Sequence, residues 1–90
     1  MNWVYILRCF DGSLYTGWTN NLEKRIAEHG RGRGAKYTRS RLPVEVVYYE
    51  IYQEPTQARK REAAIKKLSR KEKLELIGLD EKKTPEGLNG

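Results

Sequence analysis

The sequence predicts one small sheet with helices packed on it, an α/β or α+β arrangement. Two observations predict this fold. Ninety residues allow a single domain with a modest core. The segments follow in the order strand, strand, helix, strand, helix, helix, and the chain contains no internal repeat.

Residues 1–10 and 14–19 are expected to form the first two strands. Both runs are rich in β-branched and aromatic residues, and Asp11-Gly12 between them is a strong hairpin signal. Gly17 interrupts the second run, and a glycine inside a strand often marks a bulge or the close approach of another backbone or a ligand. The sequence therefore predicts a hairpin with a bulge at Gly17 or with another backbone or a ligand close to it.

The loop length of this hairpin decides whether Tyr5 and Tyr15 share a face, because opposed residues lie on the same side of a sheet. A two-residue loop would pair Tyr5 with Trp18 and put Tyr15 on the other face. An odd-length loop, such as residues 11–13, would pair Cys9 with Tyr15 and put both phenols on one face. Taken alone, the hairpin favours two ordinary strand tyrosines, because tyrosine is a common strand residue.

The next element is a helix that we expect to run to about His29. Asn20 is placed to cap it, Glu23 follows three residues later as in a capping box, and Gly30 is placed to end it in a left-handed conformation. Arg25 and His29 are four residues apart, so they share a helix face. A lone surface histidine usually has no special role, so its context must decide the function of His29.

Residues 30–40 are expected to form a loop, since the segment contains three glycines and has no apolar face to bury. Tyr37 lies in it among positive charges, placed to stack or to form a hydrogen bond. A loop of this composition can follow a phosphate chain, although it is not a phosphate-loop motif.

The most strand-like segment is residues 44–52, whose apolar residues on both faces predict the middle of the sheet. A capping box at Ser69 begins the last helix, and Gly78 is placed to end it. The polar residues 80–90 are expected to be a frayed, flexible tail. The sequence thus predicts one domain over residues 1–79.

The helix expected over residues 55–68 carries an acid on its inward side. Ala58 and Ile65 belong to its apolar stripe, and Glu62 falls four residues after the first and three before the second. A carboxylate that faces a core is costly unless it is paired or bound to a metal. An ion pair, for example with Arg25, and a metal ligand explain this position equally well.

The charge of the chain indicates a polyanion as partner. The net charge is +6, and the cations are dense in two blocks, residues 24–41 and 59–73. A solvated surface explains such blocks as well. Six tyrosines and two tryptophans favour nucleic acid, because aromatic rings stack on bases.

Cys9 is the only cysteine, which excludes an intrachain disulfide and a multi-thiolate zinc site. No apolar run reaches membrane-spanning length, and the N-terminal residues lack a signal pattern. We therefore expect a soluble, cytoplasmic protein without a membrane partner.

Six of these residues occur together in an order and spacing that is far more specific than a short motif. They are Tyr5, Tyr15, Gly17, Arg25, His29 and Glu62. The set resembles the GIY-YIG nuclease superfamily, and specifically its small stand-alone bacterial branch of uncharacterised proteins. Residues 4–6 resemble the first signature element, with valine in place of its glycine, and residues 15–17 resemble the second. The resemblance covers the chain to about Gly78.

The resemblance implies a three-stranded sheet flanked by helices and an activity that cuts phosphodiester bonds with one divalent cation, Mg²⁺ or Mn²⁺. By resemblance, Glu62 binds the metal and Arg25 belongs to the catalytic set. Tyr5, Tyr15 and His29 complete that set, and the sequence leaves open which of the three takes the proton from water. Our hypothesis is that a phenol activates the water while His29 hydrogen-bonds to it or to the phosphate. Residues 36–38 resemble a further element of the same branch, without an assigned role. Contacts with nucleic acid are expected from Gly17, Lys24, Arg31, Arg33, Lys36, Tyr37 and Arg39.

Three functions follow from these observations. The first is a metal-dependent, endonuclease-like hydrolase acting on nucleic acid, DNA more than RNA. The second is a non-catalytic or weakly catalytic nucleic-acid-binding module, and the third is an adaptor whose basic faces meet an acidic protein. Glu62 argues against the last two, because a purely electrostatic binder has no use for an inward acid. One carboxylate suits a hard cation that keeps most of its waters.

Overall fold

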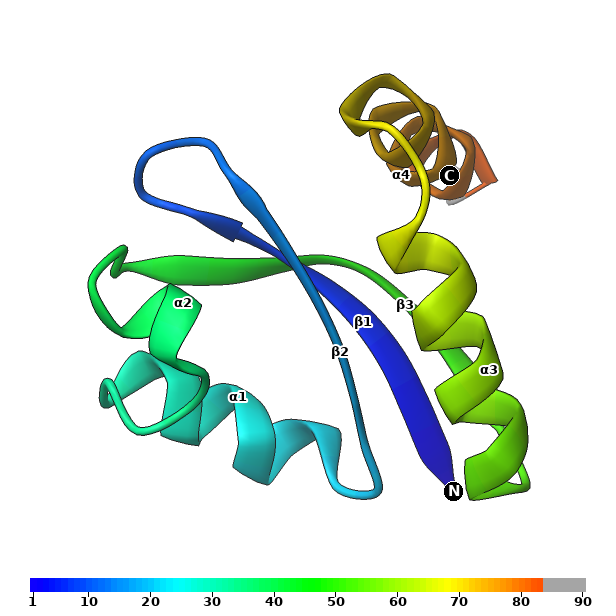
Figure 1. Ribbon diagram of the computed structural model, residues 1–90, viewed down its shortest axis with the longest axis horizontal. Helices are drawn as coiled ribbons and strands as arrows, with labels where there is room; N and C mark the ends of the chain where they lie inside the picture. The colour runs from blue at the N-terminus through cyan, green and yellow to red at the C-terminus, as the bar shows by residue number, and fades with distance from the viewer. Residues whose placement is uncertain (84–90) are drawn as a thin grey trace.

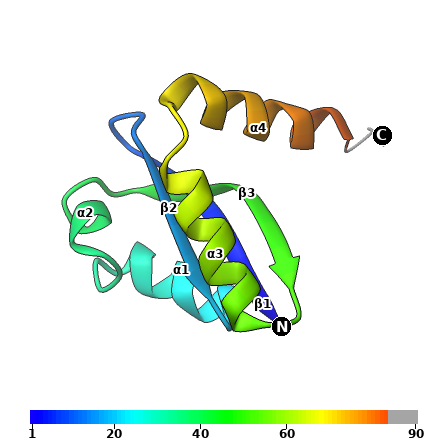
Figure 2. The ribbon, with the colours of Figure 1, turned by 45° about the vertical axis from the view of Figure 1, so that its right-hand side comes forward.

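The computed structural model describes residues 1–83, and it confirms a three-stranded antiparallel sheet flanked by helices (Figure 1). In chain order, the strands are β1 (Asn2–Cys9), β2 (Leu14–Thr19) and β3 (Val44–Tyr52). The helices are α1 (Leu22–Gly30), α2 (Lys36–Arg39), α3 (Pro55–Lys66) and α4 (Arg70–Lys83). The helices α1 and α2 lie on one side of the sheet and α3 lies on the other, with α4 leading away from its end (Figure 2).

The central strand of the sheet is β1, because the strand order is β2-β1-β3. The prediction that residues 44–52 form the middle of the sheet was therefore wrong, since β3 lies at an edge. Its side chains Tyr49 and Ile51 are 50% and 52% exposed, so the apolar pattern of β3 does not reflect burial on both faces. In β1, by contrast, the successive residues Val4 and Tyr5 are 0% and 1% exposed, as expected for a strand covered on both sides.

The register of the hairpin puts Tyr5 and Tyr15 on the same face of the sheet, as an odd-length loop predicts. Tyr5 lies opposite Gly17, and Leu7 lies opposite Tyr15. The expected pairing of Cys9 with Tyr15 was wrong by two residues, although the shared face was right. A shift of two residues keeps every side chain on its face, because side chains alternate along a strand with a period of two.

The shift arises in the loop, which comprises residues 10–12, one position earlier than expected. The Cys9 amide closes this loop by donating a hydrogen bond to the Ser13 carbonyl at 2.9 Å. The Asp11 carboxylate accepts a hydrogen bond from the Ser13 amide at 3.0 Å. Gly12 adopts a φ of 84°, a left-handed conformation that glycine reaches without a steric penalty.

The cap of α1 is Asn21, one residue later than expected. Its side-chain oxygen accepts a hydrogen bond from the Lys24 amide at 3.1 Å, while Asn20 stays outside the helix. The helix includes Gly30, and the left-handed glycine that follows it is Gly32, with a φ of 75°. The predicted helix was right, but its N-cap lies one residue later than expected and its left-handed glycine lies two residues later.

The expected loop over residues 30–40 contains the short helix α2. Thr38 in this helix is fully buried, and its hydroxyl donates a hydrogen bond to the Ala35 carbonyl at 3.0 Å. The prediction of a loop was wrong here because a single inward-facing residue holds the turn, and the surrounding cations conceal it in the sequence.

The core lies between the sheet and α3. Val4 and Ile6 of β1 are fully buried there against Ala58 and Ile65 of α3, and Ile77 of α4 closes the cluster at 5% exposure. Each large apolar side chain in such a cluster stabilises the fold by roughly 1.5–3 kcal/mol relative to full exposure. Ala58 lies four residues before Glu62 and Ile65 lies three residues after it, so these two buried residues belong to the predicted inward stripe of α3.

The last helix begins at the predicted capping box. The Ser69 amide donates to the Glu72 carboxylate at 2.8 Å, and the Glu72 amide donates to the Ser69 hydroxyl at 3.1 Å. The predicted end at Gly78 was wrong, because α4 continues to Lys83. A glycine is tolerated inside a helix when the flanking residues keep it in place, and Ile77 anchors this turn on the core.

Four residues of the predicted tail, 80–83, are therefore helical. The rest of that tail, residues 84–90, lies outside the described residues. Among the helices of residues 1–83, none combines the length and the apolar composition of a membrane span.

Candidate active site

A chain of hydrogen bonds joins Tyr5 of β1 to α1 and α2 beneath the surface. The Tyr5 hydroxyl lies 2.9 Å from His29 Nε2, and His29 Nδ1 lies 2.9 Å from the Thr38 hydroxyl oxygen. That hydroxyl donates its single proton to the Ala35 carbonyl at 3.0 Å. Tyr5 is 1% exposed, and His29 and Thr38 are fully buried.

The Thr38 hydroxyl determines which nitrogen of His29 carries the proton. Because the hydroxyl proton goes to Ala35, the hydroxyl oxygen accepts a hydrogen bond from Nδ1–H of the imidazole. Nε2 of the neutral imidazole then carries a lone pair, so it accepts the hydrogen bond of the Tyr5 hydroxyl. The chain therefore runs in one direction, from the phenol through the imidazole and the hydroxyl to the carbonyl.

Burial keeps both titratable groups of this chain neutral near pH 7. It raises the pKa of the Tyr5 phenol to about 12, against the opposing effect of the Arg25 guanidinium. Burial also lowers the pKa of the His29 imidazole, and the positive charge of Arg25 lowers that pKa further. The proton between Tyr5 and His29 thus rests on the phenol, and the lone pair of Nε2 accepts its hydrogen bond.

Two glycines make room for this chain. A Cβ atom at Gly17 would lie 2.6 Å from the Tyr5 hydroxyl oxygen and 3.1 Å from the Tyr15 ring. A Cβ atom at Gly34 would overlap the His29 imidazole. A close contact is therefore present at Gly17, but the approaching group is the Tyr5 side chain and not the backbone or ligand that the sequence predicted.

Tyr15 connects the buried chain with the surface. Its ring centroid lies 6.5 Å from that of Tyr5 and 5.4 Å from that of His29. On the outer side, the Tyr37 ring stacks on Tyr15 with 6.2 Å between centroids. The Arg41 guanidinium in turn lies 3.9 Å over the Tyr37 ring. An aromatic column thus leads from the half-exposed Tyr37 to the buried phenol.

Arg25 lies beside the buried phenol and is paired within its own helix. Its Nη1 atom donates to the Glu28 carboxylate at 3.2 Å. Burial lowers the pKa of the guanidinium, but Tyr5 and Glu28 outweigh this effect and leave the pKa raised. Within residues 1–83, Arg25 does not form the ion pair with Glu62 that was one of the two explanations of that acid.

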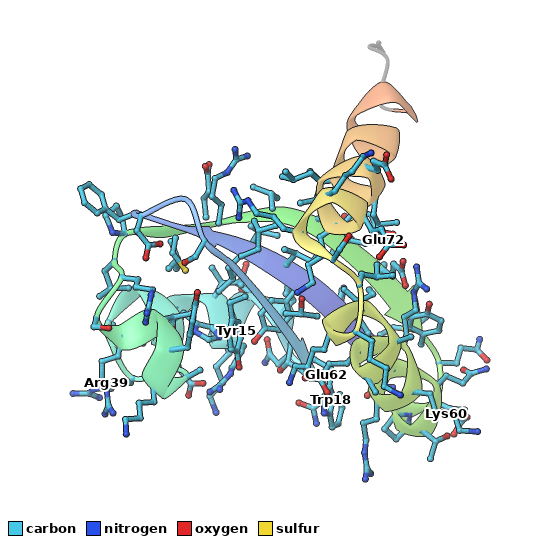
Figure 3. All side chains as sticks on the ribbon, turned by 45° about the horizontal axis from the view of Figure 1, so that its top comes forward. Tyr15, Trp18, Arg39, Lys60, Glu62 and Glu72 are labelled. Carbon is cyan, nitrogen blue, oxygen red and sulfur yellow. The ribbon has the colours of Figure 1, made fainter. Side chains whose placement is uncertain are left out.

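Glu62 approaches from the other face of the sheet, on α3 beside the edge strand β2. Its carboxylate pairs with Lys66 at 3.3 Å, one helical turn later, and its side chain is 19% exposed. Figure 3 places it next to Trp18, with Tyr15 on the side of α1 and α2. Its negative charge still reaches the Tyr5 phenol, where it contributes to the rise of that pKa after the larger effect of burial.

The four predicted catalytic residues thus lie together on one face of the sheet, and the predicted metal ligand, Glu62, lies across β2 from them. The four are Tyr5, Tyr15, Arg25 and His29. Within residues 1–78, whose side chains the structure describes, no three His, Cys, Asp or Glu side chains form a group that could hold a metal ion. His29 adds no ligand to Glu62, because both of its ring nitrogens are engaged. This donor set fits a hard cation that keeps most of its waters and takes further oxygens from a substrate.

Of the residues predicted to contact nucleic acid, Gly17 is buried in β2, and the others lie on an exposed basic surface around α1 and α2, on the same side of the sheet as Tyr5. Its five cations take part in no ion pair among the residues that the structure describes. They are Lys24, Arg31, Arg33, Lys36 and Arg39. Figure 3 shows Arg39 pointing away from the sheet, where a long polyanion can reach it.

Sequence reasoning missed Thr38 and Gly34 as members of this site. For Thr38 a signal existed, because residues 36–38 resemble an element shared with a known family branch. For Gly34 the signal was hidden, since three glycines in one short segment are explained by loop flexibility alone. Only the position of the His29 ring distinguishes Gly34 from the others.

The three-stranded sheet and the residues gathered on it define a class of protein. Residues 1–75 match the family model of the GIY-YIG catalytic domain, so the chain belongs to the nuclease-like GIY-YIG family. Among individual proteins, its relatives are UPF0213 proteins. It is 62% identical to the UPF0213 protein of Clostridium perfringens over 77 residues, which are 86% of this chain and 83% of the relative. It is 58% identical to that of Syntrophus aciditrophicus over 77 residues, 84% of this chain and 88% of the relative.

Two solved structures share the fold. The solution NMR structure of a UPF0213 protein from Bacillus halodurans superimposes with a TM-score of 0.58 at 45% identity, covering 88% of this chain and 85% of that one. The solution NMR structure of a protein from E. faecalis superimposes with a TM-score of 0.60 at 41% identity, covering 89% of this chain and 85% of that one.

Proposed function

We propose that the protein is a metal-dependent, endonuclease-like hydrolase that cuts phosphodiester bonds in nucleic acid, DNA more readily than RNA. Membership of the GIY-YIG family supports a nuclease-like activity and a nucleic-acid partner in general. The observation that carries the proposal is the buried proton path from Tyr5 to His29. A module that only holds phosphates has no use for a phenol aligned on an imidazole lone pair.

In the proposed reaction, Tyr5 takes a proton from the attacking water. A phenol with a pKa of about 12 does not ionise by itself near neutral pH. As the water proton moves to the Tyr5 oxygen, the proton of the phenol moves to His29 Nε2. The Thr38 hydroxyl holds the Nδ1–H of the imidazolium that forms. The water thus becomes a hydroxide nucleophile without a free phenolate.

Arg25 is placed to hold the scissile phosphate, because its planar guanidinium can donate two hydrogen bonds to phosphoryl oxygens. Its ion pair with Glu28 orients it beside the phenol. Glu62 would hold the divalent cation, Mg²⁺ or Mn²⁺, which when bound would neutralise charge on the phosphoryl oxygens. Because Arg25 and Glu62 belong to helices on opposite faces of the sheet, the substrate has to cross the free edge of β2.

The basic surface around α1 and α2 supplies the binding energy in this proposal. Exposed cations gain affinity for nucleic acid by releasing counterions, so binding should weaken steeply with salt. We also propose a cytoplasmic location, which rests on the composition and on the single, buried Cys9.

A non-catalytic nucleic-acid-binding module is the second candidate. It is favoured by the ion pair between Glu62 and Lys66 at 3.3 Å, which occupies the proposed metal ligand. It is also favoured by the lack, within residues 1–78, of a group of acidic side chains that could share a cation.

The deciding experiment compares wild type with Glu62→Gln on single-stranded, duplex, flapped and branched DNA and on RNA, each with Mg²⁺ or Mn²⁺. The proposal expects the variant to lose metal-dependent cleavage. Salt-sensitive binding should persist or become tighter in the variant, because one negative charge is removed. The matched control is Glu75→Gln, which removes an exposed carboxylate of α4 and should cut like wild type.

Equal cleavage by wild type and Glu62→Gln would refute the assignment of the metal ligand. Tight binding without cleavage of any of these substrates would favour the binding module instead.

A further inference from the structure

We infer that the hollow between Trp18 and α3 binds one unpaired nucleotide next to the phosphate that is cut, an inference that rests on the proposed function. The hollow has a volume of about 480 Å³, within the usual range of small-ligand sites. It is lined by Trp18, Thr56, Arg59, Lys60, Glu62 and Ala63. Figure 3 shows Trp18, Lys60 and Glu62 on this side of the molecule.

The position of the hollow follows from the alternation of side chains along β2. Gly17 faces the phenols, since Tyr5 lies opposite it, and Trp18 as the next residue projects to the other face. β2 is an edge strand, so no further strand blocks its outer side. A nucleic-acid strand that places its phosphate near Gly17 and crosses this edge brings its next nucleotide to Trp18.

The side chains of the hollow suit a nucleotide. Trp18 packs against the core on one side, which holds its ring in place, and no other aromatic ring stacks on it among the described residues. Arg59 and Lys60 are exposed cations without an ion pair within residues 1–78, whose side chains the structure describes. The Thr56 hydroxyl adds a hydrogen-bonding group. A ring for a base thus stands beside cations for its phosphate.

Another hollow that combines a ring with cations is less suited to a base. It lies at α2 and contains Tyr37, but that ring is already stacked on Tyr15 and covered by the Arg41 guanidinium at 3.9 Å. A third hollow, which contains Trp3 and Ile51, offers an aromatic ring without any cation. The hollow at Trp18 is also the one of these three that contains Glu62.

The expected ligand is an unpaired nucleotide, because a base in a duplex already stacks on its neighbours and cannot lie on a protein ring without being unstacked. Stacking on an indole tolerates any base, since every base has a π-face. The hollow should therefore select single-stranded or frayed nucleic acid over an intact duplex, without selecting sequence.

The test uses the fluorescence of Trp18 in a Trp3→Phe background, where it is the single tryptophan of the chain. A thymidine dodecamer is titrated in EDTA, so that no cleavage occurs, and binding is followed in parallel by the anisotropy of a labelled strand. We expect saturable quenching of Trp18 that follows the anisotropy, and much less quenching with a blunt duplex of equal length. Anisotropy that rises while the Trp18 emission stays unchanged would overturn the inference.

Affinity provides the second measurement. Trp18→Ala should weaken binding of the dodecamer about tenfold, the usual cost of losing one base–aromatic stack. Trp3→Ala is the matched control in the hollow without cations and should change affinity less than twofold. Because Trp18→Ala also removes core packing, Lys60→Ala serves as a variant on the exposed side of α3, with Lys71→Ala as its control. Lys60→Ala should reduce the salt dependence by about one counterion, and Lys71→Ala should not.

The inference and the proposed function can fail separately. Quenching that persists in Glu62→Gln, together with absence of cleavage in the wild type, would support the nucleotide site and reject the nuclease. Cleavage by Trp18→Ala at wild-type affinity would reject the nucleotide site and leave the nuclease standing.

Discussion

The two faces of the central strand β1 are buried in different surroundings. On the face toward α1, Tyr5 donates into a one-way chain through His29 and Thr38. On the face toward α3, Val4 and Ile6 lie in an apolar core. Adjacent residues of one strand therefore enter a hydrogen-bond chain and an apolar core in alternation, which is possible because β1 is covered on both sides.

The face toward α3 has its own polar network, and this network differs from the chain at Tyr5. The Glu50 carboxylate accepts two hydrogen bonds from Arg61 at 2.8 and 3.0 Å and one from Tyr52 at 2.6 Å, and Tyr48 also donates to it. Burial raises the pKa of Glu50, but Arg61 and the two phenols outweigh this and leave the pKa lowered. A saturated carboxylate of this kind stores no exchangeable proton.

The comparison teaches what distinguishes a network with one stable proton arrangement from one that suits the proposed proton transfer. In the Glu50 network every donor points at one charged acceptor, so the arrangement has a single stable state. In the Tyr5 network a neutral donor meets a neutral acceptor, so a proton can move when a substrate requires it. The Glu50–Arg61 pair also joins β3 to α3 and thereby helps to orient the neighbouring Glu62.

The largest expected effect is a loss of stability from truncating a core residue of β1. Ile6→Ala should lower the free energy of unfolding by about 3 kcal/mol, because it leaves a cavity in the fully buried core. Urea unfolding followed by circular dichroism measures this change. A loss below about 1 kcal/mol would show that the α3 face is not the main source of stability.

The neighbouring substitution, Tyr5→Phe, should have the opposite profile. It removes the phenol proton and should reduce cleavage at least 100-fold, the usual contribution of a general base. It should cost only about 1–2 kcal/mol of stability, since the ring stays and one hydrogen bond is lost. Rates measured at saturating metal and substrate test it, with Tyr49→Phe on the exposed edge strand as control. Full activity in Tyr5→Phe would end the proposed mechanism.

The pH dependence of stability should reveal the neutral imidazole. The pKa of His29 is lowered in the folded state from 6.5, so between the folded pKa and 6.5 the unfolded chain binds more protons than the folded one. The stabilising contribution is complete above pH 6.5 and is lost as pH falls through the folded pKa, by at most about 1.4 kcal/mol per pH unit. Unfolding of wild type and His29→Gln between pH 7.5 and 5 measures it.

His29→Gln should give the flatter stability profile over this range. The lowered pKa of Glu50 adds a loss of stability only below its ordinary value of 4.5, which lies outside the measured range of pH 7.5 to 5. A wild-type profile as flat as that of the variant would mean that His29 is not held neutral.

The smallest expected effect is a gain in stability from a substitution in β2. Thr16 of β2 lies opposite Ile6 of β1. Its hydroxyl is buried and has no hydrogen-bond partner within the described residues. Thr16→Val keeps the shape and removes the unpaired group, so it should stabilise the fold by about 1 kcal/mol. Thermal unfolding checks the sign, with the exposed Thr56→Val as control. A loss of stability would indicate that the hydroxyl is satisfied in solution.

Local patterns in the sequence were sufficient for most of the fold. The hairpin and the capping box at Ser69 depend on neighbours in the chain, and both are present. The face shared by Tyr5 and Tyr15 depends on a loop length that the sequence left open. The sequence pattern failed for the edge position of β3, because apolar residues on an exposed edge look the same as residues covered on both faces.

The sequence by itself determined which residues occur and which of them share a strand face or a helix face, since both depend on the short periods of regular structure. Only the tertiary structure decided the direction of the proton chain, because Thr38 and Ala35 reach His29 through a turn whose packing no periodicity encodes. It also decided that Glu62 pairs with Lys66 and lies across β2 from the phenols. Such placements depend on how the helices pack on the sheet, and that packing is a property of the whole chain.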